Sequence, residues 1–260
     1  MNGEIAQLVA LGCHANARLR GLASDRFWPG HSTTVFCEHV TFIVPKGNAW
    51  VMVARDPDEW LDYLARTGTV AMRCRYERGR EAHPAASAGF VGGGGIWMLD
   101  AIDGAGVVRT WRTRWQVGDR SAPDRRIWRV EYGIAGIAPK APPRTHADLG
   151  AIERALAEAL ERIRAFAIEE RPEFVASFEQ GLAALRGEGR GYHRDLAPEG
   201  VLAPDAQRLL DACQRAWVFG GMGSWNDGVF GERCVQLTDA LFDAITSAIT
   251  GAVNSGSAER

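Results

Sequence analysis

The spacing of hydrophobic residues changes near residue 140. Before this point, short runs alternate hydrophobic and polar residues, which is the period of a β-strand. After it, hydrophobic residues recur about every 3.6 positions, which is the period of an α-helix. The turn-rich segment 139–143 separates the two patterns. We therefore expect a mainly β portion over residues 1–138, a helical portion over residues 144–254 and a frayed tail over residues 255–260.

The strands of the N-terminal portion are predicted by alternation and by the turn residues between the runs. Residues 33–54 contain two alternating runs around Pro45-Lys46-Gly47-Asn48, so they form a predicted hairpin. Residues 69–77 alternate without a break and form a further strand. Residues 95–138 contain three runs separated by turns, the first turn at Asp103-Gly104. This segment is predicted to be a three-stranded antiparallel meander.

One or two short helices are expected before residue 138, and about four after it. Residues 4–22 fit a helical spacing loosely, because Gly12 and Gly21 interrupt them. The run Asp56-Pro57-Asp58-Glu59 is typical of a helix start, since Asp accepts from free amides and Pro suits the first turn. Hydrophobic stripes mark later helices over residues 146–170, after Pro172, after Pro204 and over residues 232–253. Strands followed by helices favour an α+β fold, in which the helices cover one face of the sheet within one domain.

Composition is that of an ordinary globular protein. Of the 260 residues, 46% are hydrophobic and 24% are charged, which allows a sizeable core. The net charge of -2 gives no overall attraction to nucleic acid or to an anionic membrane. No apolar run approaches the roughly 20 residues needed to span a bilayer. Of the 30 basic residues only Lys46 and Lys140 are lysines, which we attribute to a GC-rich bacterial genome rather than to nucleic-acid binding.

The five cysteines are odd in number and widely spaced, and they favour reduced thiols in a cytoplasmic protein over a disulfide framework. Cys37 and His39 lie two positions apart on a predicted strand and are expected to share a face. Together with Cys74, His31 or His14 they are a candidate zinc site or thiol–imidazole pair. We favour the alternative of a half-buried strand with a hydrogen-bonded histidine, because zinc ligands usually come in tighter pairs. No metal and no cofactor is predicted.

The stretch 217–228, Trp-Val-Phe-Gly-Gly-Met-Gly-Ser-Trp-Asn-Asp-Gly, is the most unusual in the chain. One interpretation is structural: its glycines end a helix, Asn or Asp forms a side-chain turn, and the tryptophans fasten the connection to the core. The other is functional: backbone amides converge on a ligand, with stacking and hydrogen bonds from side chains. We favour the structural interpretation for Trp217 and Phe219. The candidate binding residues are Gly223, Ser224, Trp225, Asn226 and Asp227.

A second candidate surface is the predicted meander, where tryptophans and arginines interleave. Alternation predicts that Trp111 and Trp115 face the helices while Arg112 and Arg114 face water. Such a mixture is typical of protein interfaces, and also of surfaces that stack single-stranded nucleic acid. Residues 103–131 carry only a modest excess of positive charge, so nucleic acid is disfavoured. Arg112 and Arg114 are therefore assigned to a binding surface.

No known catalytic motif is present. Neither the loop 220–228 nor Gly92–Gly95 has the spacing of a phosphate-binding or dinucleotide-binding loop, and no metalloprotease, hydrolase-elbow or deaminase signature occurs. We therefore expect a non-catalytic binding or accessory protein that recognises a protein partner or a small ligand. The alternatives are a hydrolase or transferase with its site at residues 220–228, and a protein that binds single-stranded nucleic acid. The sequence does not indicate the oligomeric state.

Overall fold

The computed structural model describes residues 1–23, 25–80, 83–142, 147–220, 222–227 and 231–257. One six-stranded sheet contains β1 (Cys37–Lys46), β2 (Ala49–Ala54), β3 (Thr69–Glu77), β4 (Ile96–Asp103), β5 (Val108–Val117) and β6 (Trp128–Ala138). The strand order is β2-β1-β6-β5-β4-β3, and all neighbouring strands are antiparallel except the parallel pair β1 and β6. The predicted α+β class is confirmed, as are the first hairpin and the β4–β5–β6 meander.

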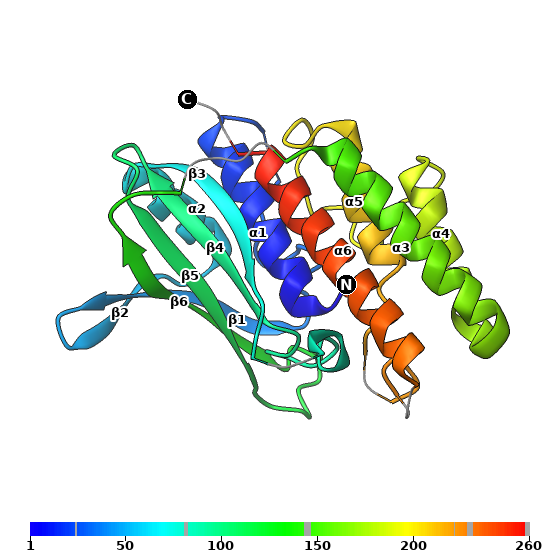
Figure 1. The fold of residues 1–260 in the computed structure, drawn as a ribbon. Helices are drawn as coiled ribbons and strands as arrows, with labels where there is room; N and C mark the ends of the chain where they lie inside the picture. The colour runs from blue at the N-terminus through cyan, green and yellow to red at the C-terminus, as the bar shows by residue number, and fades with distance from the viewer. Residues whose placement is uncertain (24, 81–82, 143–146, 221, 228–230, 258–260) are drawn as a thin grey trace.

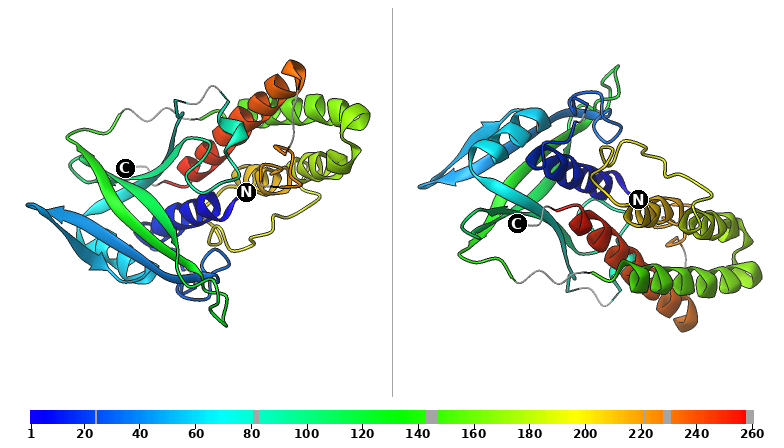
Figure 2. Two further views of the ribbon diagram at one scale, coloured as in Figure 1. Left: turned by 90° about the horizontal axis from the view of Figure 1, so that it is seen from below. Right: turned by 90° about the horizontal axis from the view of Figure 1, so that it is seen from above.

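The helices form two layers on one side of the sheet, as Figures 1 and 2 show. The layer against the sheet consists of α1 (Gly3–Leu19), α2 (Pro57–Arg66) and α6 (Glu232–Ser255), all of which contact strands. The outer layer consists of α3 (Leu149–Glu170), α4 (Val175–Leu185) and α5 (Pro204–Arg215), which pack on α6 or on one another. Short 3-10 turns occur at η1 (Pro84–Ala86) and η2 (Pro172–Phe174). Three of the four C-terminal helices therefore cover other helices rather than the sheet.

Helix α1 lies in the middle of the molecule and is buried on nearly every side. Gly12 explains how it fits: a Cβ at this position would lie 3.1 Å from Leu99 Cδ2 and 3.2 Å from Val253 Cγ1. The glycine that weakened the helical pattern in the sequence is thus the contact point of α1 with β4 and α6. A helix that is hydrophobic around its whole circumference is typical of such a central position.

Two asparagines occupy the free edge of the sheet at β3. Asn16 on α1 accepts a hydrogen bond from Met72 N at 2.9 Å and donates to Met72 O at 3.0 Å. Asn254 on α6 makes the same pair of bonds with Cys74, at 2.7 and 3.0 Å. Each amide side chain therefore replaces the next strand, and the β3 edge is covered rather than left open to pairing with another chain.

The start of α2 follows the prediction, and α6 continues into the segment that was expected to be frayed. Asp56 caps α2 as expected by accepting from Glu59 N, and Pro57 occupies the first turn. Helix α6 extends to Ser255, and Gly256 and Ser257 are buried, so the chain stays packed where fraying was expected. The rest of the predicted tail, residues 258–260, lies outside the described residues.

Candidate functional site

The 217–227 stretch connects α5 to α6, and its second tryptophan is part of the core. Trp225 is 1% exposed, and its indole N–H donates to Thr238 Oγ1 on α6 at 2.7 Å. The rings of Phe174 and Phe178 meet it edge-on at 5.3 Å, and the Arg171 guanidinium lies over it at 4.9 Å. Its ring is therefore enclosed by the helical layer and offers no open stacking face.

The neighbouring polar side chains Asp227 and Asn226 bind within the loop and to η1, respectively. Asp227 Oδ2 accepts from Gly223 N at 2.6 Å, and Gly223 adopts a left-handed φ of 76° that favours glycine. Asn226 Nδ2 donates to the carbonyl oxygens of Ala85 and Ala86 in η1, at 2.5 and 3.4 Å. The loop is thereby attached to η1. The hydroxyl oxygen of Ser224 is buried and has no hydrogen-bond partner.

The two glycine-rich stretches of the sequence meet at this point. A Cβ on Gly89 would lie 2.3 Å from Gly220 Cα, so the two backbones touch and neither position accommodates a side chain without movement. Gly92 N donates to Glu4 Oε2 at 2.8 Å, and Gly94 N donates to Ser87 Oγ at 2.8 Å. These amides bind groups of the protein itself, which fits the expectation that Gly92–Gly95 is a loop rather than a phosphate site.

Where the loop, η1 and α6 come together they line a partly open cavity of about 170 Å³. Its lining residues are His83, Ala85, Ala86, Trp225, Asn226, Val235, Thr238 and Asp239. His83 Nδ1 lies 2.6 Å from Asp239 Oδ2. The loop residue Asn226 thus shares a cavity with two titratable side chains from distant parts of the sequence.

The outer face of the sheet is a second candidate site, since none of α1 to α6 lies on it (Figures 1 and 2). One row crosses all six strands on this face, as the strand registers show: Met52, Ile43, Gly133, Arg112, Met98 and Arg75. Thr41, Glu131 and Arg114 lie in the next row. Arg112 and Arg114 are exposed on this face while Trp111 is buried beneath it, as alternation predicts.

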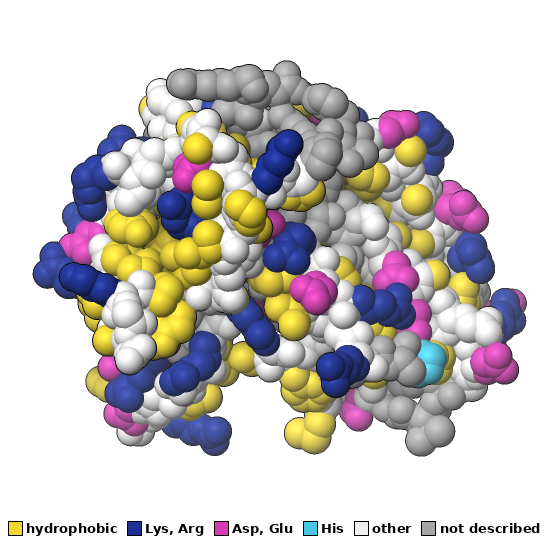
Figure 3. Space-filling view, turned by 60° about the vertical axis from the view of Figure 1, so that its left-hand side comes forward, with side chains coloured by type: hydrophobic (Ala, Val, Ile, Leu, Met, Phe, Trp, Pro, Cys, Tyr) yellow, Lys and Arg dark blue, Asp and Glu magenta, His cyan; other side chains and the backbone are white. Residues whose placement is uncertain are grey.

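Trp50 gives this face an exposed aromatic side chain. It is 57% exposed, and Met52 beside it on β2 is 53% exposed. A Cβ on Gly133 would lie 3.6 Å from Trp50 Cζ3 and 3.4 Å from Ile43 Cγ1, so the indole rests over the glycine of β6. Figure 3 shows hydrophobic side chains gathered on this side of the molecule, with Lys and Arg side chains around them. Trp50 was not among the residues expected to bind, although its position in a short hairpin is visible in the sequence.

The arginines of the sheet separate into paired and unpaired groups. Arg75, Arg109 and Arg129 each bind a carboxylate, of Asp100 at 2.9 Å, Asp103 at 3.0 Å and Glu38 at 2.8 Å. Among the described residues, Arg112 and Arg114 form no ion pair within 4 Å, although Glu131 is the cross-strand neighbour of Arg114. Arg114 donates to the side-chain oxygen of Gln116 at 2.7 Å, so neither charge is neutralised by a described carboxylate on this face.

The expectation that Cys37 and His39 share a face is wrong. The register with β6 shifts between these two residues, so the strand bulges and reverses the alternation. Cys37 points inward and contacts Gln7 on α1, whereas His39 lies near Glu38 at the surface. Burial raises the pKa of Cys37 to about 11, which keeps the thiol protonated and unreactive at neutral pH. No group of three potential metal ligands occurs among the described residues.

A cluster around Asp195 was not predicted, because its members are far apart in sequence. The backbone carbonyl of Asp195 accepts from His14 Nε2 at 3.1 Å and from His31 Nε2 at 2.8 Å. Ser32 Oγ donates to the Asp195 carboxylate and lies 2.7 Å from His193 Nδ1.

The Ser32 hydroxyl contacts a carboxylate and an imidazole at once. Burial would raise the pKa of Asp195, but the hydrogen bonds from the Ser32 hydroxyl and amide outweigh it and lower the pKa. The Ser32 hydrogen is directed at this carboxylate, and His193 lies on the other side of the hydroxyl oxygen. The cluster joins the loop after α4 to the segment between α1 and β1.

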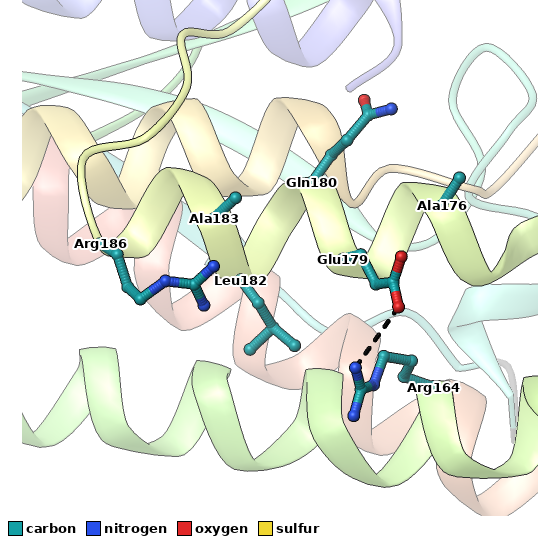
Figure 4. Close-up of a pocket in the computed structure, with 7 residues that line it drawn as sticks. All are labelled: Arg164, Ala176, Glu179, Gln180, Leu182, Ala183 and Arg186. Atoms are coloured by element: carbon teal, nitrogen blue, oxygen red, sulfur yellow. Dashed lines mark hydrogen bonds and ion pairs between the residues drawn. The ribbon is translucent and has the colours of Figure 1, made fainter.

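A further groove runs between α3 and α4, with a volume of about 490 Å³ (Figure 4). Arg164 and Glu179 face each other across it at 3.4 Å, and Leu182 supplies apolar wall. Two of its polar side chains thus bind each other. This arrangement has the features of a helix–helix surface groove and brings no reactive group together.

Comparison with protein families, with curated proteins and with solved structures finds no match to this chain. No helix in the described part of the chain is long and apolar enough to cross a membrane.

Proposed function

We propose that this chain is a binding protein that recognises a protein partner through the outer face of its sheet. The observation that carries the proposal is the position of Trp50. Its exposed ring lies over Gly133, and Gly133 belongs to the row that also contains Arg112. Tryptophan and arginine are the residues that most often dominate the binding energy of protein interfaces. A ring that already rests on the backbone of β6 loses little conformational freedom when a partner covers it.

The charges indicate what kind of partner fits. The apolar centre consists of Trp50, Met52 and Ile43. The guanidinium groups of Arg112 and Arg114, which pair with no described carboxylate, lie on the same face. A complementary surface has an apolar side chain at its centre and carboxylates beside it. Opposite charges at the edge of an interface raise the association rate and make it sensitive to salt.

The loop Gly223–Asp227 contributes less to this proposal than the sequence suggested. Trp225 is enclosed in the core and Asp227 accepts from Gly223 within the loop. The proposed partner surface therefore keeps Arg112 and Arg114 from the sequence analysis and adds Trp50 and Met52. A hydrolase or transferase site at residues 220–228 remains the alternative.

Affinity purification with matched variants tests the proposal. Wild-type protein and the variants Trp50→Ala and Arg112→Ala serve as baits in an extract of the source cells, followed by mass spectrometry. Tyr192→Ala is the control, because Tyr192 is a similarly exposed aromatic residue (64%) in the loop between α4 and α5. We expect a protein that is retained by wild type and by Tyr192→Ala, and lost by both sheet variants.

Binding is then measured with the purified partner. Arg112→Ala is expected to weaken binding more at 50 mM than at 500 mM salt, since salt screens exposed charges. A partner that binds Trp50→Ala and wild type equally well contradicts the proposal. Analytical ultracentrifugation of the purified chain shows whether a second copy of the chain occupies the face instead.

A further inference from the structure

The two edges of the sheet differ. The β3 edge is covered, because Asn16 and Asn254 bind its backbone. Strand β2 is the last strand at the other edge, and its residues Ala49–Ala54 include no charged residue and no proline. Charged residues, prolines and covering segments are the usual means by which a protein keeps an edge strand from pairing. Figure 1 shows β2 at the outer end of the sheet, on the far side from α3, α4 and α5.

The β1–β2 turn sets which backbone groups of β2 point outward. The two-residue turn 47–48 closes on the pair Lys46 and Ala49, which is therefore hydrogen-bonded. Hydrogen-bonded and non-hydrogen-bonded pairs alternate along antiparallel strands, so the next pair, Pro45 and Trp50, is not hydrogen-bonded. Pro45 agrees with this assignment, because it has no N–H to donate. The N–H and C=O groups of Trp50 consequently point away from β1.

Met52 follows the same rule, since it lies two positions further along β2 and pairs with Ile43. Trp50 and Met52 thus direct two N–H donors and two C=O acceptors outward. No further strand and no loop of the described residues binds these four groups. The two side chains are 57% and 53% exposed, and Val51 between them is 40% exposed. The edge therefore offers free hydrogen-bonding groups together with exposed apolar side chains.

A second copy of β2 satisfies these groups by antiparallel pairing about a two-fold axis at Val51. In this register Trp50 of each copy lies opposite Met52 of the other, and the two pairs form four backbone hydrogen bonds. The bulge beyond Met52 ends the regular edge, so registers centred elsewhere form fewer bonds. The side chains also match, because Trp50 meets Met52 on one face and Val51 meets Val51 on the other.

We propose that the chain forms a two-fold symmetric dimer in which β2 pairs with β2 of a second copy and the two sheets become one. A second copy fits better than an unrelated peptide, because the two residues with outward groups pair with each other and Ala49–Ala54 carries no charge that repels its own copy. Only one strand edge of each copy is buried, so we expect micromolar rather than nanomolar dissociation. The dimer leaves the outer face with Arg112 and Arg114 open to the protein partner proposed above.

Disulfide cross-linking tests the register. The two Val51 residues form a non-hydrogen-bonded pair at the axis, with Cα atoms about 4.5 Å apart, which is within the range of a disulfide. Val51→Cys should therefore form a covalent dimer on mild oxidation with diamide. Ala49→Cys is the matched control, because it is exposed on the same face of β2 but lies roughly 13 Å from its copy. It should cross-link at least tenfold more slowly. All five native cysteines are buried, which keeps the background low.

Sedimentation equilibrium of the full chain from about 5 to 300 µM measures the association without cross-linking. We expect a concentration-dependent dimer for wild type. Val51→Lys places two like charges directly opposite each other at the axis and should weaken the dimer at least tenfold. Val51→Ile keeps an apolar, strand-forming residue and should dimerise within about threefold of wild type. Urea melts at low concentration check that Val51→Lys folds as wild type does.

Three results overturn the proposal. The first is a wild-type chain that stays monomeric throughout, which leaves the edge to a segment of another protein. The second is cross-linking of Ala49→Cys as fast as Val51→Cys. The third is a dimer that Arg112→Ala weakens and Val51→Lys does not, which places the second copy on the outer face. The partner proposed above should still be retained by Val51→Lys, so loss of the dimer and loss of that partner are observed separately.

Discussion

Stability should depend on pH in part through the buried histidine His31. It is 5% exposed and stacks on the Phe27 ring at a centroid distance of 4.0 Å. The carbonyl of Asp195 accepts at 2.8 Å, so His31 Nε2 carries the proton. Nδ1 then accepts from the Thr33 hydroxyl at 2.8 Å. Both ring nitrogens are thus satisfied in the neutral form, and a second proton displaces the Thr33 hydrogen bond.

Burial lowers the pKa of His31 from its usual 6.5 to about 4. The unfolded chain therefore takes up a proton near pH 6.5, and the folded chain takes it up only near pH 4. Between these values the unfolded state binds more protons, so the free energy of unfolding falls as the pH falls. The contribution of His31 to the free energy of unfolding is fully present above about pH 7. It decreases by about 2 kcal/mol between pH 7.5 and pH 5, and by about 3 kcal/mol in total below pH 4.

Urea unfolding of wild type and His31→Gln at pH 7.5 and pH 5 measures this contribution. His31→Gln is less stable than wild type at both pH values, because glutamine fills the space of the His31 ring imperfectly. The informative quantity is the loss of stability on going to pH 5, which should be about 2 kcal/mol smaller in His31→Gln than in wild type. His39→Gln, at a half-exposed position on the sheet, is the control histidine variant. An equal loss in wild type and His31→Gln would refute the reasoning.

Three further predictions concern stability and thiol reactivity. Asn16→Ala removes both bonds to Met72 and should lower the free energy of unfolding by about 2–4 kcal/mol in urea melts, while Asn48→Ala in the exposed β1–β2 turn should change it by less than about 0.5 kcal/mol. Trp225→Ala should cost about 3–5 kcal/mol by the same measurement, and Trp50→Ala less than about 1 kcal/mol; equal costs contradict the different burial of the two rings. All five cysteines are buried, and burial raises the pKa of Cys13 and Cys213 to about 12, so a thiol reagent at pH 8 should label native protein far more slowly than protein in urea.

The sequence predicted those parts of the fold that depend on local pattern. Strand β3 has the bounds that its unbroken alternation indicated, and Asp56 with Pro57 starts α2. The parallel pairing of β1 with β6 was not predictable, because nothing in either strand specifies a partner about 90 residues away. The bulge after Cys37 was missed for the same reason, since it depends on the register with β6.

The candidate sites also depend on contacts between residues far apart in sequence, which the sequence pattern does not specify. Gly223–Asp227 was recognised as unusual from its composition, but the cavity beside it also needs Asp239 and His83, which the sequence places far away. The edge contacts of Asn16 and Asn254 were likewise invisible, because a polar residue within a helix carries no sign of the strand it meets. The residue types in the sequence thus pointed to Asn226, and the three-dimensional arrangement was needed to find His83 and Asp239 beside it.

The arginines of the meander show why a protein partner is favoured over nucleic acid. Counting charges along residues 103–131 gave a modest positive excess, but cross-strand neighbours decide which charges are free. Within strands β5 and β6, Arg109 and Arg129 are neutralised by Asp103 and Glu38, which leaves Arg112 and Arg114. A surface for single-stranded nucleic acid needs a continuous basic groove and several exposed aromatic rings.

On this sheet Trp111 is buried, and Trp115 and Trp128 pack against each other at 5.6 Å and are partly covered. Trp50 remains as the exposed indole of the sheet, with a methionine rather than a second ring beside it. One aromatic anchor with two free guanidinium groups matches the size of a hot spot on a protein interface better than a track for successive bases. A salt dependence set by two charges, rather than by six or more, is the corresponding expectation for binding measurements.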